Sequence, residues 1–159
     1  MWKMWIVNSI INFRGGNNFM KVKDKMTKNV ASVRPDTTVT QTAQLMQKHN
    51  VGSIPVVDQE NLVGIVTDRD IVVRNIAHGT DPSTTPVSSV MTTQIISATP
   101  DADVDEVTAK MAMNQIRRVP VIDNNKLVGI LAIGDVATDK RYDMEASKAL
   151  TEISKPNKK

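Results

Sequence analysis

The sequence predicts an α+β protein made of two β-α-β-β-α units, and three observations support this prediction. The chain has 159 residues, 40% hydrophobic and 23% charged, which is the balance of a soluble globular protein. A set of residues recurs at a constant offset of 65, for example Val22 and Val87. Within each copy, short β-rich stretches alternate with apolar stripes of helical period.

The internal repeat organises the chain. The recurring segments all keep the same offset of 65 residues. They are Met26-Thr27, Pro35-Asp36, Pro55-Val56, Leu62 to Ile65 and Asp70 in the first copy, and Met91-Thr92, Pro100-Asp101, Pro120-Val121, Leu127 to Ile130 and Asp135 in the second. Self-similarity at a fixed period is the signature of a repeat architecture. We therefore predict repeats over 22–79 and 87–140, a linker over 80–86, and a C-terminal helix and basic tail over 141–159.

Each copy begins with a short β stretch and a helix. The β stretches are Val30 to Val33 and Ile95 to Ala98. Polar segments at 35–38 and 100–103 follow them and predict helix starts. Beyond these starts, apolar residues three or four positions apart give each helix one buried face, as Val39 and Met46 do in the first copy.

A hairpin and a second helix complete each copy. Ile54 to Val57 and Leu62 to Thr67 predict two strands around a turn, and the second copy repeats them around 123–126. Second helices are expected from about Asp68 to Ala77 and from about Gly134 to Thr138. A unit of this size is marginal alone, so the two copies should pack together as a pseudo-twofold module.

The two ends of the chain differ from the repeats. Both tryptophans and both phenylalanines lie before residue 20. A signal peptide is one interpretation of residues 1–19, but no small-residue cleavage site follows. The favoured hypothesis is that Met20 is the true start and that 1–19 are a translated leader. At the other end, Asp143 to Ile153 predicts an amphipathic helix with Met144, Leu150 and Ile153 on one side.

Composition and motifs argue against catalysis. The chain has no cysteine, which excludes disulfides and thiolate sites and fits a reducing, cytoplasmic setting. His49 and His78 are the only histidines, and phosphate-loop, dinucleotide and metalloprotease motifs do not occur. We therefore expect no enzyme, no metal site and no catalytic cofactor. The basic clusters lie outside the repeats, which also argues against nucleic-acid binding.

The repeated motifs resemble the cystathionine-β-synthase (CBS) domain family in its tandem form. The resemblance rests on Met26-Thr27, Ile54 to Asp58, Gly64 to Asp70 and the related segment Gly129 to Asp135. It implies a dimerising module, usually a homodimer, that regulates rather than catalyses. It also implies two clefts for adenosine-containing ligands, such as AMP, ADP, ATP, NAD or S-adenosylmethionine. Separately, the apolar stretch from Met4 to Ile11 is too short to span a bilayer, so we expect no membrane association.

The candidate ligand residues cluster where the hairpin meets the second helix. Thr67 ends a strand and opens a helix, so free amide groups there favour an anion. Asp70 would repel phosphate but could accept two hydrogen bonds from a ribose diol. A helix capping box is the alternative interpretation of Thr67 and Asp70. Ala132 lacks the capping hydroxyl although Asp135 remains, beside Gly134, and this favours the ribose role.

Two arginines distinguish the predicted clefts. Arg117 and Arg118 stand where the first copy has Gly52 and Ser53. They can be a solvated strand edge. By resemblance, they reach the ligand phosphates beside Asp135. The adenine-contacting residues are transferred by the same resemblance, although each could be plain core: Ala31, Val51 and Gly52 in the first cleft, Ile96 and Ile116 in the second.

The sequence thus predicts a regulatory sensor of energy state. An adenine nucleotide, AMP, ADP or ATP, would shift its dimer or its contact with an unknown effector protein. The alternative is a ligand-free interaction module whose clefts are vestigial.

Overall fold

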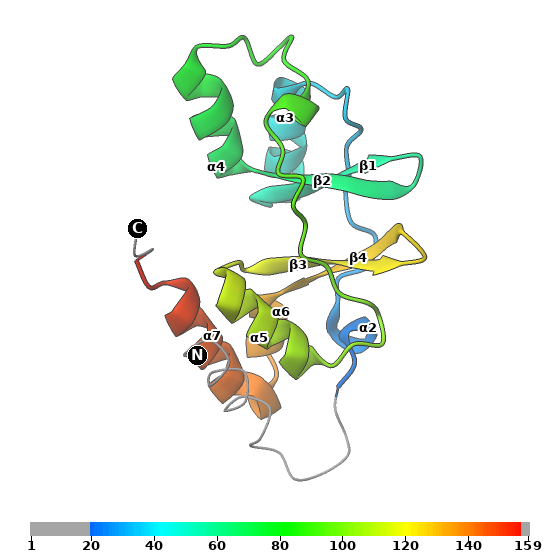
Figure 1. Cartoon of the computed structure of the whole chain (residues 1–159), viewed down its shortest axis with the longest axis vertical. Coiled ribbons are helices and arrows are strands. Elements are labelled where there is room, and N and C mark those ends of the chain that lie inside the picture. The colour runs from blue at the N-terminus through cyan, green and yellow to red at the C-terminus, as the bar shows by residue number, and fades with distance from the viewer. Residues whose placement is uncertain (1–19, 157–159) are drawn as a thin grey trace. The chain divides into compact units, whose positions relative to one another are not determined.

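The computed structural model describes residues 20–156, and the predicted leader at 1–19 lies outside them. The described chain forms two compact units (Figure 1). The first unit comprises 29–96 and 124–127, and the second comprises 20–28, 97–123 and 128–156. The opening segment of the first repeat, residues 20–28, therefore lies in the unit that holds most of the second repeat. The opening segment of the second repeat, residues 87–96, lies in the unit that holds most of the first. The sequence did not predict this exchange.

The predicted order of a helix, a hairpin and a second helix is confirmed in both units. The first unit contains α3 (Val39–His49), β1 (Ser53–Asp58), β2 (Asn61–Thr67), α4 (Asp68–Asp70), the π-helix η1 (Ile71–Asn75) and the short 3₁₀ helices η2 (Ile76–His78) and η3 (Val87–Ser89). The second contains α2 (Val22–Lys25), α5 (Val104–Asn114), β3 (Arg118–Asp123), β4 (Lys126–Ala132), α6 (Ile133–Ala137), η4 (Lys140–Tyr142) and α7 (Asp143–Ile153). Helices and antiparallel hairpins give the α+β class that the sequence predicts.

Each hairpin closes through a two-residue turn with positive φ. Ser53 pairs with Thr67 and Asp58 with Asn61 in the β1–β2 register. The turn residues Gln59 and Glu60 have φ of 47° and 73°, and Asn124 and Asn125 have 49° and 66°. Left-handed values at both positions define a tight hairpin turn whose twist matches that of the strands.

Helices α3 and α5 begin where the sequence predicts. Thr38 caps α3 by accepting a hydrogen bond from the Gln41 amide at 3.2 Å, and Asp103 occupies the corresponding position before α5. Asn50 and Gln115 end these helices in the left-handed conformation, with φ of 51° and 53°. The second helix of the first repeat differs from the expectation, because only Asp68–Asp70 is α-helical before the π and 3₁₀ turns.

The predicted opening strands are wrong as strands. Each is reduced to one parallel bridge, from Val33 to Val56 and from Ala98 to Val121. Val33 donates its amide to the Pro55 carbonyl at 3.1 Å and accepts from the Val57 amide at 2.8 Å. The chain then turns at Pro35, whose ring removes a backbone donor, so the pairing does not continue.

The exchanged opening segments are held against the hairpins. In the first unit, the amide of Thr92 donates to the carbonyl of Ile65 at 2.8 Å and the reverse bond is 3.0 Å. In the second unit, Thr27 and Ile130 form the same pair at 2.8 and 3.0 Å. A glycine precedes each contact residue of the hairpin: a Cβ on Gly64 would collide with Met91, and one on Gly129 would lie 3.0 Å from the Thr27 carbonyl oxygen. Both glycines are therefore required by close approach.

Helix α7 has the predicted bounds but not the predicted buried face. It packs against α5 and α6 (Figure 1) through Glu145, Ala146 and Ala149, which are buried. Met144 and Leu150 remain 53% and 37% exposed. The small alanines let two helix backbones approach closely. Of the expected stripe, only Ile153 packs against the core of the second unit, so the stripe is largely not the buried side of the helix.

Candidate ligand sites

The first candidate site lies where β2 passes into α4. Thr67 is the N-cap, and its hydroxyl accepts the amide of Asp70 at 3.1 Å. The Asp70 Oδ2 in turn accepts the amide and the hydroxyl of Thr67, both at 2.9 Å. These bonds form a complete capping box, so the interpretation of Thr67 and Asp70 as a helix capping box is confirmed.

Arg74 joins this site and was missed by the sequence analysis. Its Nε lies 3.6 Å from Oδ1 of Asp70, and the same guanidinium donates to the carbonyls of Val90 and Met91 at 2.9 and 3.1 Å. The spacing of four residues between Asp70 and Arg74 on a predicted helix was the available signal. Arg74 thereby connects the candidate carboxylate to the opening segment of the second repeat.

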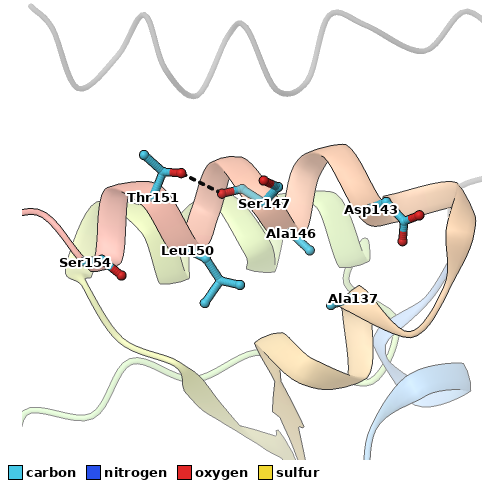
Figure 2. Close-up of a pocket in the computed structure, with 7 residues that line it drawn as sticks. All are labelled: Ala137, Asp143, Ala146, Ser147, Leu150, Thr151 and Ser154. Carbon is cyan, nitrogen blue, oxygen red and sulfur yellow. Dashed lines mark hydrogen bonds between the residues drawn. The ribbon is translucent and has the colours of Figure 1, made fainter.

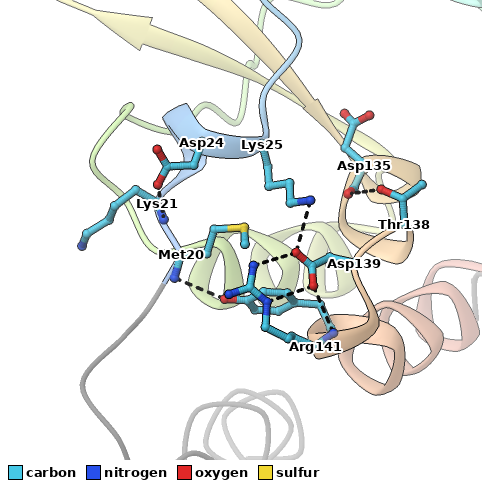
Figure 3. A network of polar contacts seen from close by, with 9 residues as sticks. Met20, Lys21, Asp24, Lys25, Asp135, Thr138, Asp139 and Arg141 are labelled. Atoms are coloured by element: carbon cyan, nitrogen blue, oxygen red, sulfur yellow. Dashed lines mark hydrogen bonds and ion pairs between the residues drawn. The ribbon is translucent and has the colours of Figure 1, made fainter.

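The second candidate site has the same geometry, but without the hydrogen bonds that a hydroxyl at the N-cap would make. The amide of Ala132 donates to Oδ2 of Asp135 at 2.9 Å. In the sequence, the absence of a hydroxyl at Ala132 favours a ribose role for Asp135, but Asp135 keeps a capping contact, because the backbone amide of Ala132 is its partner. Among the described residues, no hydrogen bond or ion pair engages the other carboxylate oxygen, and Figure 3 shows this side chain directed away from the ion pairs around Asp139.

Backbone hydrogen bonds bring the strand entry next to the helix start in both units. The amide of Asp68 donates to the carbonyl of Gly52 at 3.0 Å, and the amide of Ile133 donates to that of Arg117 at 2.9 Å. The predicted neighbours Gly52 and Thr67 are thus brought together, as are Arg117 and Ala132. The side chains of Arg117 and Arg118 are exposed.

The remaining predicted site residues differ in exposure. Val51 is exposed, whereas Ala31, Ile96 and Ile116 are half-buried, and Ile116 packs against the core of the second unit. Gly134 is exposed, with no atom within 4 Å of an added Cβ. Ser53 is 8% exposed, and its Oγ has no hydrogen-bond partner in the structure. A buried hydroxyl without a partner is unusual and marks a place where a ligand can supply one.

A second polar network occupies the position of the second repeat that corresponds to Arg74. Asp139 lies 3.2 Å from the Lys25 ammonium and 2.8 Å from the Arg141 guanidinium (Figure 3). Hydrogen bonds from the Arg141 side chain and amide, with a smaller contribution from Lys25, hold the pKa of the Asp139 carboxyl well below its usual range. This network ties the opening segment of the first repeat to the second unit.

Other features of the described chain do not coincide with these sites. A pocket of about 530 Å³ lies along α6 and α7, lined by Ala137, Asp143, Ala146, Ser147, Leu150, Thr151 and Ser154 (Figure 2). None of the predicted ligand residues lines it. Within residues 20–156, we find no cluster of three metal-ligating side chains and no helix long and apolar enough to cross a bilayer.

Comparison with known proteins shows that the chain belongs to the CBS domain family. The family model for the CBS domain matches residues 22–75 and 87–139. CBS domain-containing protein YhcV of Bacillus subtilis is 48% identical over 136 residues, which cover 86% of this chain and 96% of that protein. Stand-alone proteins of this family are regulatory ligand-binding modules.

Two solved structures show the same fold. Hypoxic Response Protein I with two coordinated zinc ions matches with a TM-score of 0.70 and 36% identity, covering 75% of this chain and 98% of that one. The CBS domain pair of MJ0100, in complex with 5′-methylthioadenosine and S-adenosyl-L-methionine, matches with a TM-score of 0.68 and 31% identity over 76% of this chain and 95% of that one.

Proposed function

We propose that the chain is a regulatory sensor that binds an adenosine-containing ligand at one or both candidate sites. The supporting observation is an arrangement that occurs in both repeats. A carboxylate, Asp70 or Asp135, lies one helical turn beyond the end of the second hairpin strand. The first residue of that helix donates its amide to the residue that precedes the first hairpin strand. A carboxylate oxygen that remains open beside a helix start can accept hydrogen bonds from a ribose diol. The MJ0100 complex, which holds two adenosine compounds, favours this ligand class.

AMP, ADP or ATP is the proposed ligand of the second site. Arg117 and Arg118 are exposed beside the start of α6, and two guanidinium groups suit phosphate oxygens because they donate charge-assisted hydrogen bonds. The bound nucleotide would report the energy state through the dimer or through an effector protein, and the module itself would perform no chemistry.

The test is a calorimetric titration of purified protein with adenosine and AMP. Because Asp135 also caps Ala132, Asp135→Ala would mix loss of the cap with loss of a ligand contact, whereas Asp135→Asn keeps an oxygen for the amide. At the second site, we expect Asp135→Asn to weaken the binding of both ligands about tenfold to a hundredfold, and Arg118→Ala to weaken AMP by a similar factor with little effect on adenosine. Arg34→Ala, which removes an exposed arginine elsewhere, is the control.

The outcome also assigns the working site. If Asp70→Asn abolishes AMP binding while Asp135→Asn does not, the nucleotide belongs to the first site. If neither adenosine nor AMP binds the unsubstituted chain, and a thermal-shift screen with ADP, ATP, NAD and S-adenosylmethionine also shows no rise in melting temperature, the sensor proposal is wrong.

We further propose that the protein acts as a homodimer. An apolar surface patch on η1 and η2, formed by Val72, Val73 and Ile76, is 57%, 48% and 54% exposed. Such a patch also favours the second candidate function, a ligand-free interaction module. Light scattering of the protein at micromolar concentration should give twice the mass of the chain, and Val73→Lys should give a monomer. A monomer without the substitution would contradict the dimer. The cytoplasmic setting stays a prediction.

A further inference from the structure

The two candidate sites differ in charge at two pairs of equivalent positions, each with one charged and one uncharged residue. By the offset of 65, Gly52 corresponds to Arg117 and Asp68 to Ile133. The same backbone hydrogen bond joins each pair, at 3.0 Å in the first unit and 2.9 Å in the second. The two sites can therefore be compared residue by residue within their own units.

In the first unit, a carboxylate occupies the place from which the second unit extends a guanidinium. A Cβ built on Gly52 would lie 3.0 Å from Oδ2 of Asp68 and 3.5 Å from its Cγ. The Asp68 Oδ1 accepts the amide of Arg69 at 2.7 Å, which fixes the side chain in this position. Ile133, at the equivalent position, is 7% exposed and belongs to the core of the second unit.

The arginines near the first site, Arg69 and Arg74, do not give it the net positive charge that the second site has. Arg74 directs its guanidinium to the carbonyls of Val90 and Met91 and to the hydroxyl of Thr92. Arg69 is exposed on the same turn as two carboxylates, Asp68 and Asp70. The charged side chains around the first site thus balance, whereas Arg117 and Arg118 leave a net positive charge beside Asp135.

Ser53 gives the first site a neutral polar group. It pairs with Thr67 in the β1–β2 register, and residues directly opposite in an antiparallel pair project from the same face. The Ser53 Oγ therefore lies on the face that carries the Thr67 and Asp70 capping box, and it has no partner in the structure. The second repeat has Arg118 in its place.

We propose that the first site selects an adenosine ligand without phosphate, whose 5′ end is neutral or cationic, and that Asp68 is the residue that excludes phosphate. The inference rests on the proposed function and assigns the chemical class of ligand to one of its two sites. A phosphate beside the Asp68 carboxylate would meet a like charge, which is costly in a recognition site. The second site, with its arginine pair, takes the phosphorylated ligand.

The test uses the full chain with Asp135→Asn, which weakens the second site so that the tighter binding measured belongs to the first site. Adenosine and AMP are titrated into this chain by calorimetry. AMP should bind at least tenfold more weakly than adenosine. Adding Asp68→Ile, which introduces the side chain found in the second repeat, should strengthen AMP about tenfold and leave adenosine within twofold. Asp36→Asn, which removes an exposed carboxylate far along the chain, is the matched control, and equal melting temperatures check that each variant is folded.

Every outcome decides the question. Equal affinity of the Asp135→Asn chain for AMP and adenosine overturns the selectivity, and so does its failure to bind either while the unsubstituted chain binds both. Unchanged AMP affinity after Asp68→Ile overturns the role of Asp68. If the unsubstituted chain binds neither adenosine nor AMP, the selectivity is overturned; the proposed function falls with it only if the thermal-shift screen with ADP, ATP, NAD and S-adenosylmethionine also shows no rise in melting temperature. These outcomes are distinguishable because all the others require binding by the unsubstituted chain.

Discussion

Helices α3 and α5 occupy equivalent positions in the two repeats, but only α5 is covered on a second face. Thr108, Ala109 and Ala112 of α5 are 0%, 3% and 4% exposed, and α5 packs against α7. The corresponding residues of α3 are Ala43, Gln44 and Gln47, and all three are exposed. A single repeat has thus been adapted by a few small side chains to accept an additional helix in one copy.

The two units also differ in the side chains that hold the exchanged segments. In the first unit, Arg74 donates to backbone carbonyls of the segment and approaches the candidate ligand carboxylate, Asp70. In the second unit, Asp139 forms an ion pair with Lys25 of the segment, and within residues 20–156 no ion pair or side-chain hydrogen bond joins Asp139 to Asp135. Only the first site is therefore linked by side-chain contacts to the segment that its unit receives from the other repeat.

The largest predicted effect tests the extra helix. Ala112→Gln places in the second unit the residue that the first repeat has at this position. Because Ala112 is buried beneath α7, the longer polar side chain should overpack the interface and bury an amide, lowering the free energy of unfolding by about 2 to 4 kcal/mol. Urea denaturation measures it. The reverse change, Gln47→Ala, should stay within about 0.5 kcal/mol because Gln47 is exposed. Equal losses at both positions would contradict the comparison.

An intermediate effect separates the two close-approach glycines. Gly129→Ala should cost about 2 kcal/mol, since its Cβ would lie 2.6 Å from the flexible Met26 side chain and also 3.0 Å from the hydrogen-bonded carbonyl of Thr27, a backbone atom that cannot move aside. Gly64→Ala should cost about 1 kcal/mol, since only the flexible side chain of Met91 stands in its way.

Double-mutant cycles supply the control for this pair. Removing the methionine side chain with Met91→Ala should relieve most of the strain of Gly64→Ala, whereas Met26→Ala should relieve little of that of Gly129→Ala. Similar relief in both cycles would show that the backbone contact at Thr27 is unimportant.

The smallest predicted effect is faster amide exchange of one segment at acidic pH. A carboxyl whose pKa is lowered on folding stabilises the native state above its unfolded pKa, near 3.9, and loses this contribution as the pH falls through the folded pKa. Because Arg141 and Lys25 lower the pKa of Asp139, amide exchange over 20–27, corrected for intrinsic rates, should accelerate below about pH 4. We expect roughly a threefold change, since the network lies at the surface.

The first unit provides the comparison for this measurement. The guanidinium of Arg74 holds its segment through carbonyl oxygens, which do not titrate, so exchange over 87–92 should respond less. Asp139→Asn should remove the pH dependence over 20–27. An equal response of both segments, or a dependence that survives Asp139→Asn, would show that another group is responsible.

Several features of the candidate sites could be predicted from the sequence. The positions of Thr67 and Asp70 at a strand end and helix start followed from the repeat and from local capping preferences, and the structure has the capping box there. The retained cap at Asp135 could not be predicted from residue types, because a backbone amide is the donor at every residue except proline and carries no sequence signal. The carboxylate of Asp68 over Gly52 also escaped notice, since capping alone explained an acidic residue at that position.

The sequence by itself determined the repeat, the α+β class, the hairpins and the starts of the long helices. These depend on periodicity and on hydrogen bonds between residues close along the chain, which a linear pattern records. Only the tertiary structure decided which unit receives each opening segment, which face of α7 is buried and which charges meet at each site. Two similar repeats offer similar surfaces to a segment such as 20–28 or 87–96, so local pattern cannot choose between them. That choice depends on contacts between residues far apart along the chain, such as Met91 with Gly64 and Met26 with Gly129.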